Sequence, residues 1–479
     1  MTPEEFREYG HRVVDLIADY RAGVSGQSVQ ATVRPGEIKA GLPVVPPSQA
    51  EPFDRILADV ERMIGPGLTH WSHPSFYGFF PAPIELASVL GDYLSTGLGV
   101  VGLSWQSSPA LTEVEERVMD WVRQMVGLSS AWSGVIQDTA STSTLVALLS
   151  ARERATAYGA TRGGLQAEPA PLTVYLSAQA HSSVLKAALL AGFGRQNITE
   201  VEVDDAFAIR PDALEAAVAR DLARGAKPCA IIGTTGTTTS TAFDPIDRLA
   251  VIAKAHGMWL HVDAAMAGSA MVLPECRHLW AGIEDADSIV INAHKWLGVA
   301  FDCSLYYVRD PEHLVRVMST NPSYLQSSAD GQVKNYRDWG IPLGRRFRAL
   351  KVWLLIREQG VDRIAARLRR DLVNAQWLAN EIRHAAGWRV LAPVALQTLC
   401  VRHEPAGLTG EDLDRHTQGW ADRINRSGQA YLTPAVLDGR WVVRVSISGL
   451  LTERGHLEAL WALMRREAKG TGGQVAARR

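Results

Sequence analysis

The sequence has few cysteines, and its apolar runs are short. Only four cysteines occur in 479 residues, and no two of them form a Cys-x-x-Cys pair. They are Cys229, Cys276, Cys303 and Cys400. This spacing argues against a disulfide framework or a zinc site and predicts buried, reduced thiols, as is usual in the cytoplasm. The N-terminus has no apolar signal core. The runs 86–90 and 98–103 are far shorter than the roughly 20 residues that span a bilayer. We therefore expect a cytoplasmic protein with no membrane segment.

A strong excess of one charge is also lacking. Lysine and arginine number 49 against 51 aspartates and glutamates, a formal net charge of −2. Such a balance gives no reason to expect nucleic acid or an anionic membrane as a partner. The one dense basic cluster, "GRRFRALK" at 344–351, is interleaved with apolar residues and favours a helix start with structural arginines. With 47% hydrophobic and 21% charged residues, the composition is that of a globular protein.

The middle of the chain alternates between two kinds of apolar pattern. Strands are predicted at 172–177, 198–203, 228–234, 258–264 and 287–293, and helices at 111–128, 142–160, 182–194, 211–225 and 247–257. Short apolar strands that alternate with helices of this length predict an α/β domain with a largely parallel sheet, covered by helices on both faces. In open sheets of this kind, ligands bind beyond the carboxyl ends of the strands.

The pattern divides the chain into three expected parts. Residues 1–85 begin with a helix, signalled by a capping box at Thr2–Glu5, and continue with the proline-rich stretch 32–52. This part looks too extended to form its own core, so we expect it to pack on a partner subunit. Residues 86–360 form the large domain. Residues 361–479 change to long helices and a few strands, which predicts a smaller α+β domain.

Polar residues follow several of the predicted strands. His181 comes after the first, a threonine-rich turn at 235–239 after the third, Asp263 ends the fourth, and Lys295 follows the fifth. Each has an ordinary interpretation alone: a lysine with its stem along apolar surface, a capping aspartate, a turn. Because parallel strands end at one edge, we expect these side chains to lie together.

Together these residues predict a site for pyridoxal 5′-phosphate. The helix that begins within "DTASTST" at 138–144 offers backbone N–H groups to a phosphate. Lys295, among apolar neighbours, is suited to form a Schiff base. Asp263 can keep the pyridine nitrogen protonated, so that the ring accepts electrons. His181 can stack on the ring.

The motifs closely resemble those of the aromatic-L-amino-acid decarboxylases, which are group II pyridoxal-phosphate-dependent decarboxylases. They are "IQDTAS", "AHSSV", "HVDAAMAGSA", "NAHKW", "FDCS" and "IPLGRRFRALK", in the family's order over nearly the whole chain. The resemblance implies the type I, aspartate-aminotransferase-like fold, with a mainly parallel seven-stranded sheet. It also implies a homodimer with active sites at the subunit interface.

The resemblance also assigns roles to individual residues. It makes Lys295 the Schiff-base lysine, Asp263 the partner of the pyridine nitrogen and His181 the stacking residue. The remaining cofactor contacts that it implies are Ala140, Ser141, Thr238, Asn292 and His294. In the long polar segment 319–344, Tyr324 matches a lid tyrosine that protonates the α-carbon after CO₂ leaves. Aldehyde synthases among the relatives often have Phe there, or Asn at the stacking histidine, so Tyr324 and His181 favour simple decarboxylation.

The substrate pocket that the resemblance implies is apolar. It consists of Phe79, Phe80, Pro81, Ala82, Val101, Leu103 and Gln397, with Val101 and Leu103 on the partner subunit. Such a pocket suits an aromatic ring and penalises the second carboxylate of glutamate. Ala82, Leu103, Gln397 and Met266 depart from the family pattern, so Trp, Tyr, Phe and Dopa all remain candidate substrates. The alternatives are an aldehyde synthase or aminotransferase-like enzyme on the same cofactor, a decarboxylase of a non-aromatic amino acid, and a scaffold without cofactor.

Overall fold

The structure, a computed structural model, describes residues 1–320 and 331–470 in two compact units. The larger unit comprises residues 82–375 and 392–399, and the smaller one the remaining described residues. Among the helices of these residues, none is both long and apolar enough to cross a membrane. All four cysteines are buried, free thiols, as predicted.

The larger unit contains a seven-stranded sheet with the order β1-β7-β6-β5-β4-β2-β3. The strands are β1 (Ser133–Gln137), β2 (Leu172–Ser177), β3 (Ile198–Val201), β4 (Lys227–Thr234), β5 (Trp259–Asp263), β6 (Ser288–Asn292) and β7 (Ser304–Val308). Strand β7 pairs antiparallel with both β1 and β6, and the other neighbours pair in parallel. Every strand except β7 therefore points the same way, which confirms the predicted fold class.

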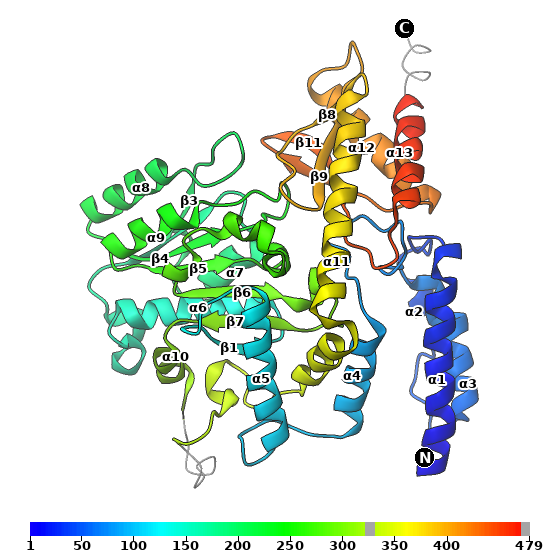
Figure 1. The fold of residues 1–479 in the computed structure, drawn as a ribbon, viewed down its shortest axis with the longest axis horizontal. Coiled ribbons are helices and arrows are strands. Elements are labelled where there is room, and N and C mark those ends of the chain that lie inside the picture. The colour runs from blue at the N-terminus through cyan, green and yellow to red at the C-terminus, as the bar shows by residue number, and fades with distance from the viewer. Residues whose placement is uncertain (321–330, 471–479) are drawn as a thin grey trace. The chain divides into compact units, whose positions relative to one another are not determined.

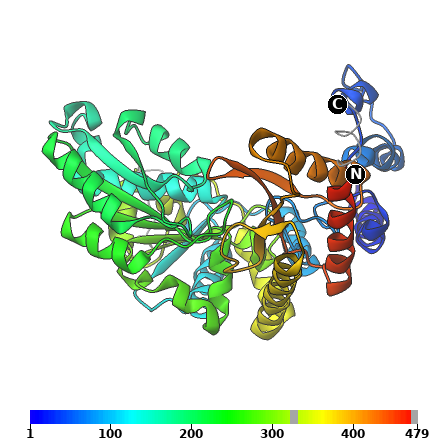
Figure 2. The ribbon, with the colours of Figure 1, turned by 90° about the horizontal axis from the view of Figure 1, so that it is seen from above.

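Helices surround this sheet (Figure 1). They are α4 (Leu86–Gly97), α5 (Pro109–Met125), α6 (Ala140–Ala155), α7 (Ser182–Leu190), α8 (Pro211–Ala223), α9 (Ile246–Ala255), α10 (Pro311–Met318) and the first part of α11 (Arg348–His384). In Figure 2 the strands of this unit run between helices on either side. Every residue of β5, β6 and β7 is buried. Because side chains alternate between the two faces of a strand, complete burial requires cover on both faces.

The smaller unit contains a four-stranded sheet with the order β10-β11-β9-β8. Its elements are α1 (Pro3–Gly23), α2 (Glu37–Gly41), α3 (Phe53–Asp59), β8 (Trp388–Val390), β9 (Thr398–His403), α12 (Gly410–Ser427), β10 (Thr433–Leu437), β11 (Arg440–Ser446) and α13 (Arg454–Lys469). The predicted capping box starts α1, where the Thr2 hydroxyl accepts from the Glu5 N–H and the Thr2 N–H donates to the Glu5 carboxylate.

This division differs from the three expected parts. The N-terminal segment shares a unit with the C-terminal residues, because Phe76 forms a β-bridge with Tyr431 and the centroids of their stacked rings lie 5.2 Å apart. The Trp71 ring also stacks on that of Phe76, at 4.8 Å. Nor does a boundary fall at residue 360, because α11 continues from Arg348 to His384 through a kink at Gly360. Gly360 has φ 65°, a left-handed conformation that glycine adopts without steric cost.

Two histidines, the buried His416 and the partly buried His403, form a pair in the smaller unit. His403 Nδ1 and His416 Nε2 are 2.9 Å apart, and the Trp388 ring lies 4.8 Å from that of His403. Burial, followed by the nearby His403 and Arg423, lowers the pKa of His416 to about 4. In the unfolded chain a histidine has a pKa of about 6.5.

A stability profile against pH should report this pair. Since the folded-state pKa of His416 lies below the unfolded value, its contribution is complete above about pH 6.5 and declines as the pH falls toward about 4. We expect His416→Gln to lose stability less steeply than the parent over this range, measured by urea unfolding midpoints. The control is His11→Gln on the exposed surface of α1, whose profile should follow the parent. Parallel profiles for His416→Gln and the parent would contradict the assignment.

Candidate active site at the carboxyl edge of the large sheet

The register of the sheet brings the ends of four strands together. Gln137 and Asn292, the last residues of β1 and β6, both pair with Ser304 of β7. Asp263, the last residue of β5, pairs with Val290 on one side and with Thr234, the last residue of β4, on the other. The segments that follow these strands therefore leave the sheet side by side, as the sequence predicted.

Lys295 lies in a tight turn directly after β6. The turn, Ala293–Leu297, has a π-helical hydrogen-bonding pattern, and Lys295 departs from helical geometry with φ −95° and ψ −107°. The next residue, Trp296, is fully buried, and its indole Nε1 donates to Asp371 Oδ2 at 2.9 Å. This anchor fixes the backbone beside Lys295, whose own side chain is only partly buried.

Asp263 is buried at the end of β5 and points one carboxylate oxygen at its own turn. Its Oδ1 accepts from the Ala265 N–H at 3.0 Å, and its backbone carbonyl accepts from the Thr235 N–H at 2.9 Å. Within the described residues, Oδ2 makes no hydrogen bond. A buried carboxylate oxygen without a donor is suited to a positively charged N–H of a ligand.

His181 caps the start of α7, and the charges of Lys295 and Asp263 both act on its pKa. Its Nδ1 accepts from the Ser183 N–H at 3.2 Å. Partial burial and then the positive charge of Lys295 lower the pKa of His181, while the carboxylate of Asp263 acts in the opposite direction. The three side chains are thus close enough to interact, and His181 is neutral at neutral pH.

The start of α6 offers an anion site at the same edge. The helix begins at Ala140, and the side chain of its N-cap, Thr139, makes no capping hydrogen bond. Free N–H groups and the helix dipole at such an end attract a phosphate. Asn292 is buried nearby in the register of the sheet, and its Oδ1 has no hydrogen-bond partner among the described residues. Ser141 is exposed in the first turn.

Comparison with known proteins agrees with this arrangement. Residues 35–404 match the pyridoxal-dependent decarboxylase conserved domain. The chain belongs to this family.

It is 39% identical to tryptophan decarboxylase 2 of Oryza sativa subsp. japonica, over 99% of this chain and 97% of that protein. It is 38% identical to a phenylacetaldehyde synthase of Arabidopsis thaliana, over 98% and 96%. A crystal structure of Oryza sativa TDC with PLP and tryptamine has a TM-score of 0.95, 34% identity, and coverage of 98% and 99%. The predicted enzyme class, a carboxy-lyase, and the predicted cofactor are confirmed.

The site of this decarboxylase fits pyridoxal phosphate on its own chemistry. Asn292 Oδ1, which has no hydrogen-bond partner among the described residues, and the uncapped N-terminus of α6 are suited to the polar, anionic part of the cofactor. Asp263 Oδ2 is suited to its protonated ring nitrogen. Thr238 is partly exposed at the tip of its turn. Its neighbour Thr237 is committed within the turn, where its hydroxyl accepts from the Ala242 N–H at 3.0 Å.

His294 has a structural role in the decarboxylase. Its Nδ1 accepts from the Cys303 N–H at 2.9 Å, and the Phe301 ring meets it edge-on at 4.8 Å. Burial and then the charge of Lys295 lower its pKa to about 4. His294 therefore holds the turn after β6 against the segment 301–303, which leaves its predicted contact with the cofactor as a prediction.

The predicted substrate-pocket residues belong to both units of the decarboxylase. Phe79, Phe80 and Pro81 belong to the smaller unit, where the Arg444 guanidinium lies 4.8 Å from the Phe80 ring and donates to the Phe79 carbonyl. In the larger unit, Ala82 is half-buried, and the side chains of Val101 and Leu103 both lie close to Gly344. The predicted pocket lining remains a prediction.

Gln397 is fully buried in the larger unit, next to Met266. Its Nε2 lies 2.9 Å from the Met266 sulfur, and its Oε1 has no hydrogen-bond partner in the part of the chain that the structure describes. The Met266 methyl in turn faces the threonine-rich turn near Gly236. Two of the residues in which the sequence departs from the family pattern, Gln397 and Met266, are therefore packed against each other. Tyr324, the predicted lid residue, lies outside the described residues.

Two residues that were not identified from the sequence, His261 and Asp371, make hydrogen bonds that hold the elements of this sheet edge together. His261, two residues before Asp263 on the same face of β5, lies 2.9 Å from Ser288 Oγ and 3.4 Å from Thr144 Oγ1. It thereby joins β5, β6 and α6, and burial lowers its pKa to about 4, so that it is neutral. Asp371, the anchor of Trp296, was also missed. The only signal for Asp371 would have been a charged residue on a buried stripe of α11.

Proposed function

We propose that this enzyme decarboxylates an aromatic L-amino acid to the corresponding arylalkylamine and CO₂. The observation that carries the proposal is the meeting of Lys295, Asp263 and His181 at one sheet edge, beside the uncapped start of α6. The Oryza sativa and Catharanthus roseus structures, named for TDC with tryptamine and for tryptophan decarboxylase with L-tryptophan, support an aromatic substrate.

The proposed roles follow from where the side chains lie. Bound pyridoxal phosphate supplies an electron sink for the pair of electrons that the leaving CO₂ releases. Asp263 holds the proton on the ring nitrogen and so keeps that sink available. Neutral His181 covers the ring without adding a competing positive charge. The start of α6, with Ala140, Ser141 and Asn292, holds the phosphate, and Lys295 supplies the amine that bonds the cofactor.

We also propose a homodimer in the cytoplasm. Helix α4 exposes leucines at positions 86, 90, 94 and 98, which recur every four residues and so share one face. Helix α1 has no buried residue in the described chain. Apolar faces of this extent mark subunit contacts. Buried free thiols support a reducing compartment. A monomeric mass in solution, by light scattering, would argue against the dimer.

Product analysis is the experiment that tests the proposed activity. The purified holoenzyme is incubated separately with Phe, Tyr, Dopa, Trp, 5-hydroxy-Trp and glutamate, and amine, CO₂, aldehyde, ammonia and peroxide are quantified. The proposal requires amine in a one-to-one ratio with CO₂ from at least one of these substrates. Aldehyde with ammonia and peroxide as the main products would instead establish an aldehyde synthase, the activity named for the 38% identical Arabidopsis thaliana relative. Release of CO₂ from glutamate alone would overturn the aromatic assignment.

The choice between amine and aldehyde should depend on Tyr324. We expect Tyr324→Phe, which lacks the proton-donating hydroxyl, to slow amine formation by about a hundredfold or more and to raise the fraction of aldehyde. Both products are measured under air and under nitrogen, because aldehyde formation needs oxygen. Tyr9→Phe, on α1, is the matched control and should leave the product ratio unchanged. An unchanged ratio in Tyr324→Phe would remove this residue from the reaction.

A further inference from the structure

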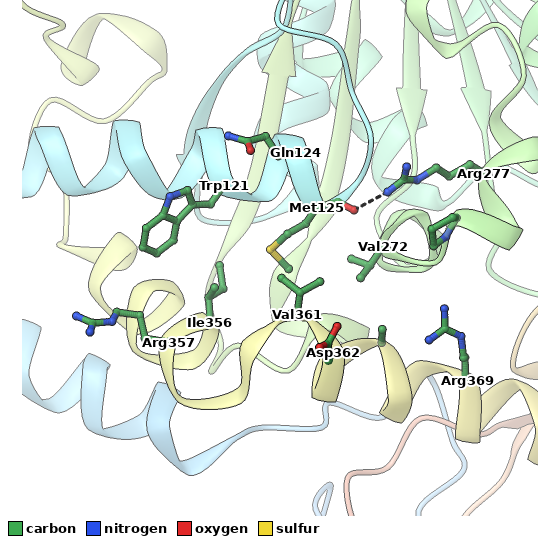
Figure 3. Close-up of a pocket in the computed structure, with 12 residues that line it drawn as sticks. Trp121, Gln124, Met125, Val272, Arg277, Ile356, Arg357, Val361, Asp362 and Arg369 are labelled. Atoms are coloured by element: carbon green, nitrogen blue, oxygen red, sulfur yellow. Dashed lines mark hydrogen bonds between the residues drawn. The ribbon is translucent and has the colours of Figure 1, made fainter.

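The larger unit contains a cavity that is open to solvent and is formed by elements that carry none of the predicted site residues. Its volume is about 670 Å³, and it lies between the end of α5, the segment 272–277 and the middle of α11 (Figure 3). Small-molecule sites in proteins have volumes of this size, about 300–1,000 Å³.

One wall of this cavity is apolar. This wall consists of Trp121 and Met125 of α5, Val272 of the segment 272–277, and Ile356 and Val361 of α11, as Figure 3 shows. Ile356 and Val361 lie on opposite sides of the kink at Gly360, so the bend in α11 lets both face the cavity. An indole, a thioether and branched side chains form a surface on which an aromatic ring packs well.

The opposite end holds a cation in a fixed position. The guanidinium of Arg277 donates from Nε to the Met271 carbonyl at 2.9 Å and from Nη2 to the Met125 carbonyl at 3.0 Å. The backbone at Gly127 lies so close that a Cβ there would be 2.6 Å from the guanidinium carbon. Two carbonyls and a glycine therefore hold this arginine in one orientation.

The charge of Arg277 has no carboxylate partner among the residues that the structure describes. Its Nη1 also makes no hydrogen bond to any of them. The other arginine on this side, Arg369, is different, because it forms two hydrogen bonds to the Glu275 carboxylate, at 2.6 and 3.1 Å. One carboxylate, Asp362, also lines the cavity, and its charge acts on Arg369. An oriented guanidinium without a carboxylate partner, beside an apolar wall, is suited to an anion that carries an apolar body.

We propose that this cavity binds a small aromatic carboxylate. The ring packs on Trp121, Met125 and Ile356, and the carboxylate bonds Arg277. This site is independent of the proposed catalytic activity, since it shares no residue with the edge that carries Lys295. Val272 and Arg277 belong to the segment that follows β5, so a ligand here also contacts the part of the chain that leads away from Asp263.

Calorimetric titration of the holoenzyme tests the proposal with three probes. They are 3-phenylpropanoate, its neutral amide 3-phenylpropanamide, and acetate. We expect the carboxylate to bind about tenfold or more tightly than the amide, because a charge-assisted hydrogen bond is lost, and acetate not to bind measurably, because the apolar wall is unused.

Two variants on the same helix then locate the binding. Val361 is 42% exposed at the cavity, and Val373 is 61% exposed elsewhere on α11, so both positions accept a larger side chain without refolding. We expect Val361→Trp to fill the cavity and weaken 3-phenylpropanoate at least about tenfold, and Val373→Trp to bind as the parent does. Unchanged affinity in Val361→Trp would place the probe elsewhere, including the active site. Equal affinity for acid and amide would contradict the role of Arg277. Either result overturns the proposal.

Discussion

Replacing Lys295 by alanine should reduce decarboxylation by about a thousandfold or more. A positioned proton-transfer group alone contributes up to about ten thousandfold, and this lysine is also the group proposed to bond the cofactor. The neighbouring backbone is fixed independently by the hydrogen bond from Trp296 to Asp371. We therefore expect the fold and the remaining proposed cofactor contacts, at Asp263, Asn292 and the start of α6, to stay in place in the variant.

The measurement separates attachment from catalysis. The holoenzyme is reduced with borohydride, and its intact mass is determined after denaturation; the parent should retain one cofactor per chain and Lys295→Ala none. Lys186→Ala, at an exposed position of α7, is the matched control and should behave as the parent in both mass and rate. If Lys295→Ala kept the cofactor after reduction and denaturation, the covalent bond would lie at another amine, and the assignment would be wrong.

The sheet edge was predictable because two periodic signals agree there. Strands β2, β4, β5 and β6 appear in the sequence as short, mainly apolar runs, and burial on both faces accounts for this. Their exits carry His181, Asp263 and Lys295, whose residue types have few other reasons to occur together. Parallel pairing then places them at one edge without any knowledge of distances.

Strands β1 and β7 were not predicted, for a different physical reason. Strand β7 follows the turn that carries Lys295 so closely that no α-helix separates it from β6, and β1 is an edge strand whose one neighbour in the sheet is β7. A strand that returns antiparallel without a helix breaks the alternation on which the prediction depended. Yet β7 is what aligns Gln137 with Asn292, and so brings the start of α6 to the edge with Lys295.

Long-range polar contacts also could not be predicted from the sequence. The bond from Trp296 to Asp371 joins residues 75 positions apart, and the contact of His261 with Thr144 joins residues 117 apart. Neither pair has a local motif, because a buried hydrogen bond is specified by packing and not by spacing. Domain boundaries were hard to place for the same reason, since the N-terminal segment is held by contacts with residues near 431.

Among these long-range contacts, the buried ion pair of Glu115 and Arg345 should cause the largest loss of stability when it is broken. Glu115 of α5 and Arg345 are 1% and 7% exposed, and Arg345 donates to both Glu115 oxygens, at 2.9 and 2.6 Å. The same carboxylate accepts from the Ile136 N–H of β1, and Arg345 donates to the Ile136 carbonyl. We expect Glu115→Ala to lower the free energy of unfolding by about 3–5 kcal/mol, because it leaves a buried guanidinium uncompensated.

The adjacent residue provides the control for this prediction. Glu116 pairs with Lys334 at 4.0 Å across partly exposed side chains, so Glu116→Ala should cost no more than about 1 kcal/mol. Unfolding is followed by urea titration of the holoenzyme. In the double variant Glu115→Leu/Arg345→Met, both charges are absent, and the loss should be smaller than in Glu115→Ala, because no buried charge remains unpaired. Equal losses in Glu115→Ala and Glu116→Ala would show that the ion pair does not hold α5 to β1. A double variant less stable than Glu115→Ala would show that its hydrogen bonds to Ile136 outweigh the charge, since β1 leads directly into the start of α6.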